Sequence, residues 1–164
     1  MDDLDVVTRQ LGRVPRAFNR VVARCPFGAP AVTEQKPYSP AGEPFPTMYY
    51  LTCRHLVAAV SRLEAAGGVE RWTALVAEDE QLTAALQRAT ERQVLLRRRL
   101  ADGEIGTDGG AALATGIGGS RSPERLKCLH AHVAFALAEP GYAIGEGVMA
   151  ELPERWPERC CSLP

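Results

Sequence analysis

A thiol and two imidazoles lie within one short segment of the sequence, at Cys128, His130 and His132. If this segment is helical, Cys128 and His132 project from one face, one turn apart, whereas His130 points elsewhere. A thiolate and an imidazole at that spacing could share a metal ion, and a thiol beside an imidazole could act as a nucleophile with its base. This segment is therefore the first candidate site.

Two further cysteines, Cys25 and Cys53, lie far upstream and could join the segment through folding. Tetrahedral zinc takes four nitrogen or sulfur ligands, and Cys25, Cys53, Cys128 and His132 would satisfy that preference. An iron–sulfur cluster is less favoured because the usual close cysteine spacing is absent. Free cysteines are also often small buried side chains in a core. A zinc site and metal-free core thiols both stay open as interpretations.

Cys128 is also a candidate nucleophile, with His130 or His132 as its base. A helix N-terminus and the neighbouring Lys127 would both favour the thiolate. The sequence Ser122-Pro-Glu predicts, however, that the helix begins at Pro123. Cys128 would then lie beyond the first turn, where the effect of the helix dipole has mostly faded.

The glycine-rich segment 115–120, which contains Gly118, precedes the predicted helix and could cradle a small anion. Arg121, Arg125 and Lys127 would add positive charge. The segment lacks both the Walker ending and the Rossmann spacing, which favours an ordinary loop before a capped helix. The longer glycine-rich stretch 103–120 could be either a lid or a linker.

Composition limits the classes of protein to consider. The chain of 164 residues has the length of one domain, which we place at residues 1–152 with a C-terminal tail at 153–164. Its net charge of −1 gives no reason to expect a nucleic-acid partner. No stretch approaches the roughly 20 apolar residues of a membrane span, and the acidic N-terminus is unlike a signal peptide, so we expect a cytoplasmic protein.

The N-terminal third reads as one short helix followed by strands. Apolar spacing predicts a helix over residues 2–11 that ends at Gly12. Residues 18–25 and 31–35 read as a hairpin, and residues 47–52 as a short strand after a proline-rich loop. On that strand Tyr49 and Tyr50 point to opposite faces, so one packs inside and the other faces solvent or a cleft.

The rest of the chain reads as helices, predicted at residues 54–66, 70–77, 79–101, 123–138 and 145–152. Arg97, Arg98 and Arg99 form a solvated cluster at the end of the longest helix. Cys160 and Cys161 are interpreted as incidental thiols of the tail. The fold class is α+β, with a small N-terminal antiparallel β element packed on a mostly helical single domain.

Several distinctive segments carry a family resemblance: residues 24–32, 42–53, 61–65, 116–119 and 127–132. Together they resemble a bacterial family, well represented in actinobacteria, that is catalogued as domain of unknown function 501. The resemblance implies that Cys25, Cys53, Cys128 and His132 are motif positions, and it implies no established activity. Members of the family that it resembles are often encoded near genes of cell division and of polyphosphate or glycolytic metabolism. This chain departs from the family at residues 89–91, where it has Ala-Thr-Glu in place of the family's Ala-His-Glu pattern.

Three hypotheses follow for the function. The first is a protein with a cysteine and histidine zinc site, either structural or hydrolytic. The second is a metal-free interaction or scaffold protein with an unknown protein partner, linked by the resemblance to cell division or polyphosphate metabolism. The third is a cysteine-dependent enzyme that uses Cys128.

Overall fold

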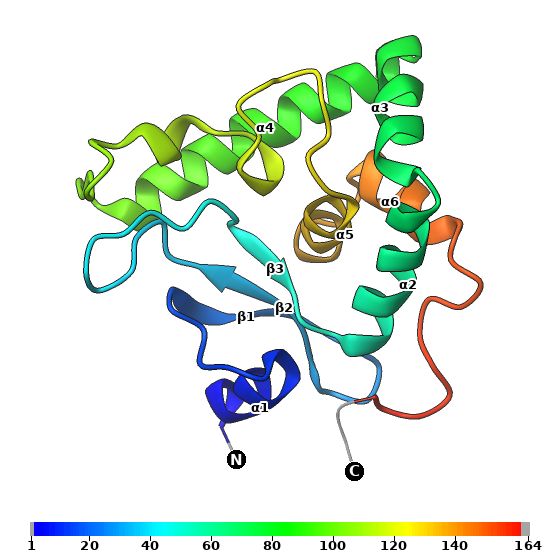
Figure 1. Ribbon diagram of the computed structural model, residues 1–164, viewed down its shortest axis with the longest axis horizontal. Coiled ribbons are helices and arrows are strands. Elements are labelled where there is room, and N and C mark those ends of the chain that lie inside the picture. The colour runs from blue at the N-terminus through cyan, green and yellow to red at the C-terminus, as the bar shows by residue number, and fades with distance from the viewer. Residues whose placement is uncertain (1, 162–164) are drawn as a thin grey trace.

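In the computed structural model, residues 2–161 are described (Figure 1), and helices surround a small sheet in an α+β arrangement. A sheet of three strands has the order β1–β2–β3, and both strand pairs are antiparallel. The α-helices and strands are α1 (Asp3–Leu11), β1 (Phe18–Arg24), β2 (Pro30–Gln35), β3 (Tyr49–Leu51), α2 (Arg54–Ala65), α3 (Gly68–Glu78), α4 (Glu80–Ala101), α5 (Leu129–Ala138) and α6 (Ala143–Ala150). The predicted fold class is confirmed.

The N-terminal elements follow local signals in the sequence. Asp2 accepts a hydrogen bond from the amide of Asp5 and caps α1, which ends at Gly12 in the left-handed conformation that glycine adopts without strain. The predicted hairpin forms as β1 and β2, and β2 is buried along its length because it lies between the other two strands. The predicted strand at 47–52 is shorter, since only Tyr49–Leu51 is paired.

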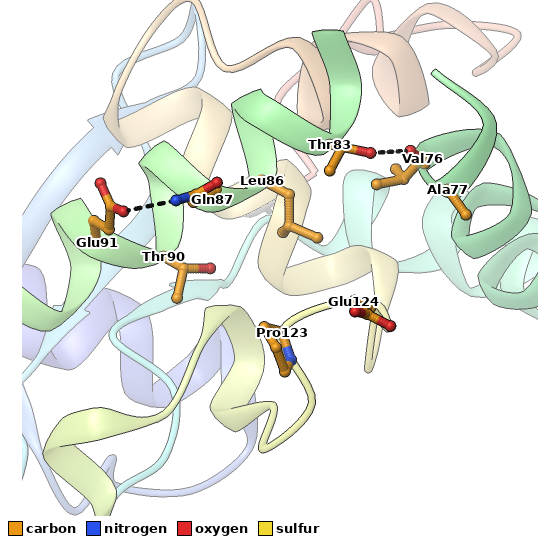
Figure 2. A pocket seen from close by; sticks show the side chains of 9 residues that line it. All are labelled: Val76, Ala77, Thr83, Leu86, Gln87, Thr90, Glu91, Pro123 and Glu124. Carbon is orange, nitrogen blue, oxygen red and sulfur yellow. Dashed lines mark hydrogen bonds between the residues drawn. The ribbon is translucent and has the colours of Figure 1, made fainter. Parts of the chain in front are cut away.

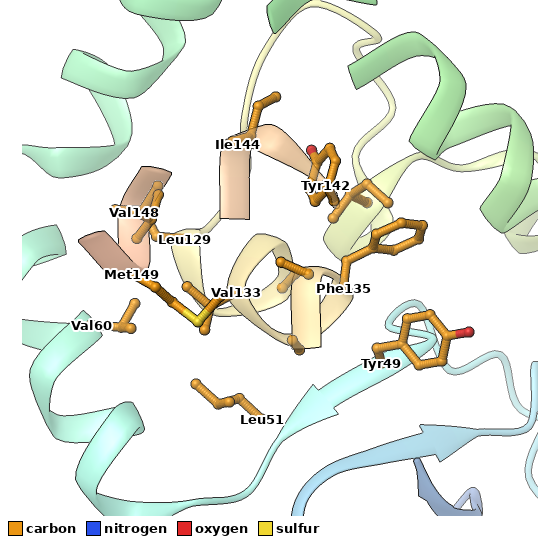
Figure 3. Packing of buried hydrophobic residues seen from close by; sticks show 14 of the residues in the cluster. Tyr49, Leu51, Val60, Leu129, Val133, Phe135, Tyr142, Ile144, Val148 and Met149 are labelled. Carbon is orange, nitrogen blue, oxygen red and sulfur yellow. The ribbon is translucent and has the colours of Figure 1, made fainter. Parts of the chain in front are cut away.

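Helix α5 is the central element of the molecule. Figure 1 shows it between the sheet and the helices α2, α4 and α6, and most of its residues are buried. Figure 3 shows Leu129, Val133 and Phe135 of α5 packed among side chains of β3, α2 and α6. A helix that is apolar on nearly every side is stable only when it is surrounded in this way.

Helix α5 begins at Leu129, so the predicted start at Pro123 is wrong. Residues 123–127 form turns and bends instead. The first amide of α5, that of Leu129, donates to Oε1 of Glu64 on α2 at 2.6 Å. The helix therefore receives a capping partner from another helix, which a local capping pattern such as Ser122-Pro-Glu cannot reveal.

The predicted solvated arginine cluster is also wrong for one of its members. Arg97 is fully buried, and its Nη2 donates to the carbonyl oxygen of Phe45 at 2.8 Å. Arg98 and Arg99 are exposed and lie in the last turn of α4, as expected from the helix dipole. Arg97 differs because the end of α4 packs against the proline-rich loop that precedes β3.

Candidate functional site

The four predicted metal ligands lie in different surroundings. Cys25 follows β1 in the hairpin turn, Cys53 is the N-cap residue of α2, and Cys128 is the N-cap residue of α5. His132 is buried inside α5. Across residues 2–161, no three side chains of histidine, cysteine, aspartate or glutamate are arranged to hold a metal ion. The expected zinc centre, like the less favoured iron–sulfur cluster, therefore has no ligand set among the described residues.

The side chain of His132 belongs to the core. Its Nδ1 lies 2.8 Å from the hydroxyl of Tyr142, whose ring stacks against the imidazole. Its Nε2 is buried and has no hydrogen-bond partner among the described residues. Burial lowers the pKa of His132 to about 3, which keeps the imidazole neutral near pH 7. Cys128 and His132 do not form the expected pair, because Cys128 is the N-cap residue that precedes α5 and does not lie within the helix.

His130 connects two polar side chains of α2 and forms the core of the candidate site. Its Nδ1 lies 3.0 Å from Oε1 of Glu64, and its Nε2 lies 3.1 Å from Oγ of Ser61. Ser61 and Glu64 are three residues apart on one face of α2, which turns both toward α5. A carboxylate, an imidazole and a hydroxyl are thus joined in the order that activates a serine for nucleophilic attack.

Two backbone groups hold this constellation in place. The amide of Leu129 donates to the same Oε1 of Glu64 that faces His130, so the carboxylate is fixed by the start of α5. The carbonyl oxygen of Val57 lies 3.2 Å from Nε2 of His130. When Nδ1 donates its proton to Glu64, a neutral imidazole can accept from the hydroxyl of Ser61 at Nε2. A protonated imidazole can donate to Val57 at the same atom.

A cavity of about 310 Å³ adjoins the imidazole. Its walls are mostly apolar or aromatic and belong to β3, α2 and the start of α5; they comprise Thr47, Tyr49, Tyr50, Leu51, Val57, Cys128, His130 and Ala131. The volume is at the lower end of small-molecule sites, for which about 300 to 1,000 Å³ is common. Ser61 is not among the residues that line this cavity, but its exposed hydroxyl lies one hydrogen bond from His130, which does line it.

The two tyrosines of β3 separate as expected. Tyr49 is buried, its hydroxyl lies 3.0 Å from Oε1 of Glu139, and its ring packs edge-on against Phe135. Burial raises the pKa of Tyr49. Tyr50 is half-buried and contacts the ring of Phe45. Tyr49 is therefore a neutral, fixed wall of the cavity.

Cys128 lies closer to the helix N-terminus than the sequence predicted, a position that favours a thiolate. Its thiol is nevertheless not activated as a nucleophile. As the N-cap residue it lies at the positive end of α5, although its thiol forms no capping hydrogen bond. Burial raises the pKa of the Cys128 thiol, Glu64 adds to that rise, and the charge of Lys127 and the nearby helix amides only partly oppose it. Within the described structure the hydrogen bonds of His130 go to α2 and not to this thiol.

The sequence favours an ordinary loop over an anion-binding one at the glycine-rich segment, and this loop does not lead directly into a helix. Residues 117–119 form a short 3-10 turn, and α5 begins only at Leu129. Gly118 has a φ of 68°, and a Cβ there would lie 3.5 Å from Sγ of Cys128. The loop therefore packs over the start of α5 and supports the candidate site from behind.

A larger groove of about 670 Å³ lies between α3, α4 and the segment around Pro123. Figure 2 shows Leu86 and Thr90 of α4 facing Pro123 across it. Three of its polar side chains are engaged locally, since Thr83 donates to the carbonyl of Val76 and Gln87 donates to Glu91. No histidine or cysteine lines this groove, so among the described cavities it offers a binding surface more than a reaction centre.

Sequence reasoning named His130, Lys127, Gly118 and Tyr49 near the site but assigned no role to Ser61 or Glu64. Both lie in segment 61–65, which had been singled out only for the family resemblance. A serine followed three residues later by a glutamate on a predicted helix was the available signal, because that spacing places both on one face. Their partner His130 lies 69 residues from Ser61, a pairing that only the fold provides.

Comparison with known proteins identifies the family of this chain but does not identify a reaction. A family model described as "Protein of unknown function (DUF501)" matches residues 21–150. No curated protein matches significantly, and neither does any solved structure. Within residues 2–161 we also find no helix with the length and apolar character needed to cross a membrane.

Proposed function

We propose that this chain, which belongs to the DUF501 family of proteins of unknown function, is a hydrolase that cleaves small esters or related acyl compounds with Ser61 as nucleophile. The observation that carries the proposal is the continuous arrangement of Ser61, His130 and Glu64, with contacts of 3.1 and 3.0 Å on the two nitrogens of one imidazole. Nucleophile, base and orienting carboxylate are recognised by such geometry, not by their order in a sequence.

The proposed reaction begins with transfer of the Ser61 hydroxyl proton to Nε2 of His130 as Oγ attacks the substrate carbonyl carbon. The resulting imidazolium is stabilised by the carboxylate of Glu64 and by the carbonyl oxygen of Val57. The imidazolium then protonates the leaving group as the acyl–oxygen bond breaks, which leaves an acyl group on Ser61. A water molecule, deprotonated by the same imidazole, releases the acid and restores the hydroxyl.

The shape of the cavity supports a short acyl or aromatic substrate. Apolar groups such as Leu51 and Val57, together with the ring of Tyr49, favour an uncharged group of a few carbon atoms. Cys128 supplies a neutral thiol to the wall, because burial raises its pKa. A p-nitrophenyl ester of butyric acid is a suitable first substrate, since its good leaving group makes acylation of the serine easy.

The test compares Ser61→Ala with Ser122→Ala, an exposed serine outside the arrangement. We expect the Ser61 variant to lose hydrolysis of the ester to the level of buffer while keeping its melting temperature, because the hydroxyl is exposed and alanine favours helix. The Ser122 variant should retain full activity. Equal activity in both variants, or a purified protein that never exceeds buffer, would exclude Ser61 as a nucleophile.

A second candidate function, binding of a protein partner, is favoured by the groove of about 670 Å³ beside α4. In that case His130 would only join α2 to α5. His130 variants would then change the melting temperature alone, whereas Ala77→Arg, a change at an exposed residue of this groove, would weaken partner binding. The serine comparison above distinguishes the two functions directly.

A further inference from the structure

The sulfur atoms of Cys53 and Cys161 lie 3.6 Å apart although the two residues are 108 positions apart in the chain. Cys53 is the N-cap residue of α2 and is almost fully buried at 1% exposure. Cys161 is half-buried and packs against the hydrophobic core. Cys161, interpreted from the sequence as an incidental thiol, is therefore placed against Cys53, because the tail folds back against α2.

Other contacts hold the tail in this position. Nε2 of His55, in the first turn of α2, lies 2.9 Å from the carbonyl oxygen of Glu154. Nη1 of Arg155 pairs with Glu146 of α6 at 3.6 Å, and Trp156 packs against the core. Figure 1 shows the tail running from α6 past α2. The encounter of the two sulfurs is thus fixed by several contacts of the tail and not by the thiols alone.

We propose that Cys53 and Cys161 form a reversible disulfide that fastens the tail to the start of α2 under oxidising conditions. A disulfide requires the sulfurs to approach to about 2.05 Å, a movement of between one and two ångströms. The tail can supply it, because residues 152–161 contain no helix or strand. The adjacent Cys160 gives the chain a second thiol that lacks this placement.

The oxidant we name is a peroxide, and each step balances. The thiolate of Cys161 attacks one peroxide oxygen, so that an S–O bond forms, the O–O bond breaks and water leaves after protonation. Cys53 then attacks the sulfenic sulfur, which forms the S–S bond and expels hydroxide, and the proton of Cys53 converts that hydroxide to water. Two thiols and one hydrogen peroxide give one disulfide and two waters.

The buried partner should limit the rate of this reaction. Burial, reinforced by the nearby Cys161, raises the pKa of Cys53 to about 12, so little of it is thiolate at neutral pH. We therefore assign the first oxidation to the more accessible Cys161 and the resolving attack to Cys53. The proposal is independent of the reaction assigned to Ser61, because it concerns the tail and the first turn of α2.

The test oxidises the reduced, folded chain with hydrogen peroxide, blocks remaining thiols, and maps peptides by mass spectrometry without reductant. Trypsin with a glutamate-specific protease separates Cys53 from Cys25 at Glu34. We expect a crosslink between the peptides of Cys53 and the tail in the wild type and in Cys160→Ser, and none in Cys161→Ser. The closed loop should also raise the melting temperature by about 5 to 10 °C, reversed by dithiothreitol.

Three results would overturn the proposal. The first is a Cys53 that still reacts with an alkylating reagent after denaturation of the oxidised protein. The second is a crosslink that persists in Cys161→Ser through Cys160. The third is a crosslink that forms only when the protein is oxidised in denaturant. Because Cys160→Ser leaves the 3.6 Å pair intact, it serves as the matched control for the serine substitution itself.

Discussion

His130 and His132 are separated by one residue of α5 and have opposite surroundings. The side chain of His130 is 26% exposed and both of its nitrogens have partners on α2. His132 is 1% exposed, bonds only Tyr142, and keeps one buried nitrogen without a partner in the described structure. A helix turns by about 200° over two residues, which directs one imidazole to a cavity and the other into the core.

The difference shows that closeness in sequence does not define a site. The proposed reaction requires His130 to accept and return a proton, and a carboxylate and a carbonyl oxygen face its two nitrogens. His132 cannot do so near neutral pH, because burial lowers its pKa to about 3. One imidazole is therefore suited to chemistry and the other to packing, and four predictions can break or sharpen that contrast.

The largest expected effect comes from exchanging each histidine for glutamine. His130→Gln should lower the rate of ester hydrolysis by about 10³-fold or more, because the base is lost. His132→Gln should leave the rate within a few-fold of wild type when assayed well below its melting temperature. Kinetic assays at one temperature measure both rates, and His55→Gln, a histidine of α2 outside the proposed site, is the control. A similar loss of hydrolysis rate in both variants would contradict the proposed difference between the two histidines.

The second prediction concerns acid. Below about pH 6.5 the unfolded chain binds a proton at His132, whereas the folded chain does so only near pH 3. Stability should therefore fall as pH drops through this range, by about 1.4 kcal/mol per pH unit from this group. Urea unfolding at several pH values should show a flatter dependence in His132→Gln. An identical slope in the variant would show that His132 titrates normally.

The third prediction tests the carboxylate that orients His130. Glu64→Gln should reduce hydrolysis by about 10²-fold, because the imidazolium loses its counter-charge. Its stability should change little, since the amide oxygen still accepts from Leu129. Glu64→Ala also removes the cap of α5 and should lower the free energy of unfolding by about 1 kcal/mol more. Full activity in Glu64→Gln would remove the carboxylate from the mechanism.

The smallest effect is expected at the loop behind the site. Gly118→Ala places a Cβ 3.1 Å from that of Ala131 at a φ of 68°, and should destabilise the fold by about 1 to 2 kcal/mol. Gly116→Ala is the matched control, because its φ is −79° and its nearest contacts are 3.5 Å away. Chemical denaturation of the two variants provides the comparison, and equal stabilities would contradict a packed loop.

Much of the fold could be predicted from local patterns. Asp2 and Gly12 bound α1, the turn residues between 25 and 30 define the hairpin, and apolar periodicity locates α2 and α4. The start of α5 could not be predicted because its capping group comes from Glu64 of α2. Arg97 was misassigned for a similar reason, since its partner is the distant carbonyl of Phe45.

The candidate site was predicted only in part. His130 and Tyr49 were named from the sequence, but the emphasis fell on thiols that the described structure does not assemble. The chain has only five cysteines, so each one attracts notice as a candidate site residue. Ser61 and Glu64 do not stand out in the same way, because serine and glutamate are common in the sequence. Their function depends on the approach of α2 to α5, which no local pattern contains. The expected link to cell division or polyphosphate metabolism stays a prediction.

The most direct test of the account is labelling of the native protein with a fluorophosphonate, followed by peptide mapping. This reagent phosphonylates a serine only when a base activates its hydroxyl. We predict modification at Ser61 that is abolished in His130→Gln and retained in His55→Gln. A wild-type protein that remains unlabelled at Ser61, or that is labelled there equally without His130, would contradict the proposed serine–histidine–glutamate site.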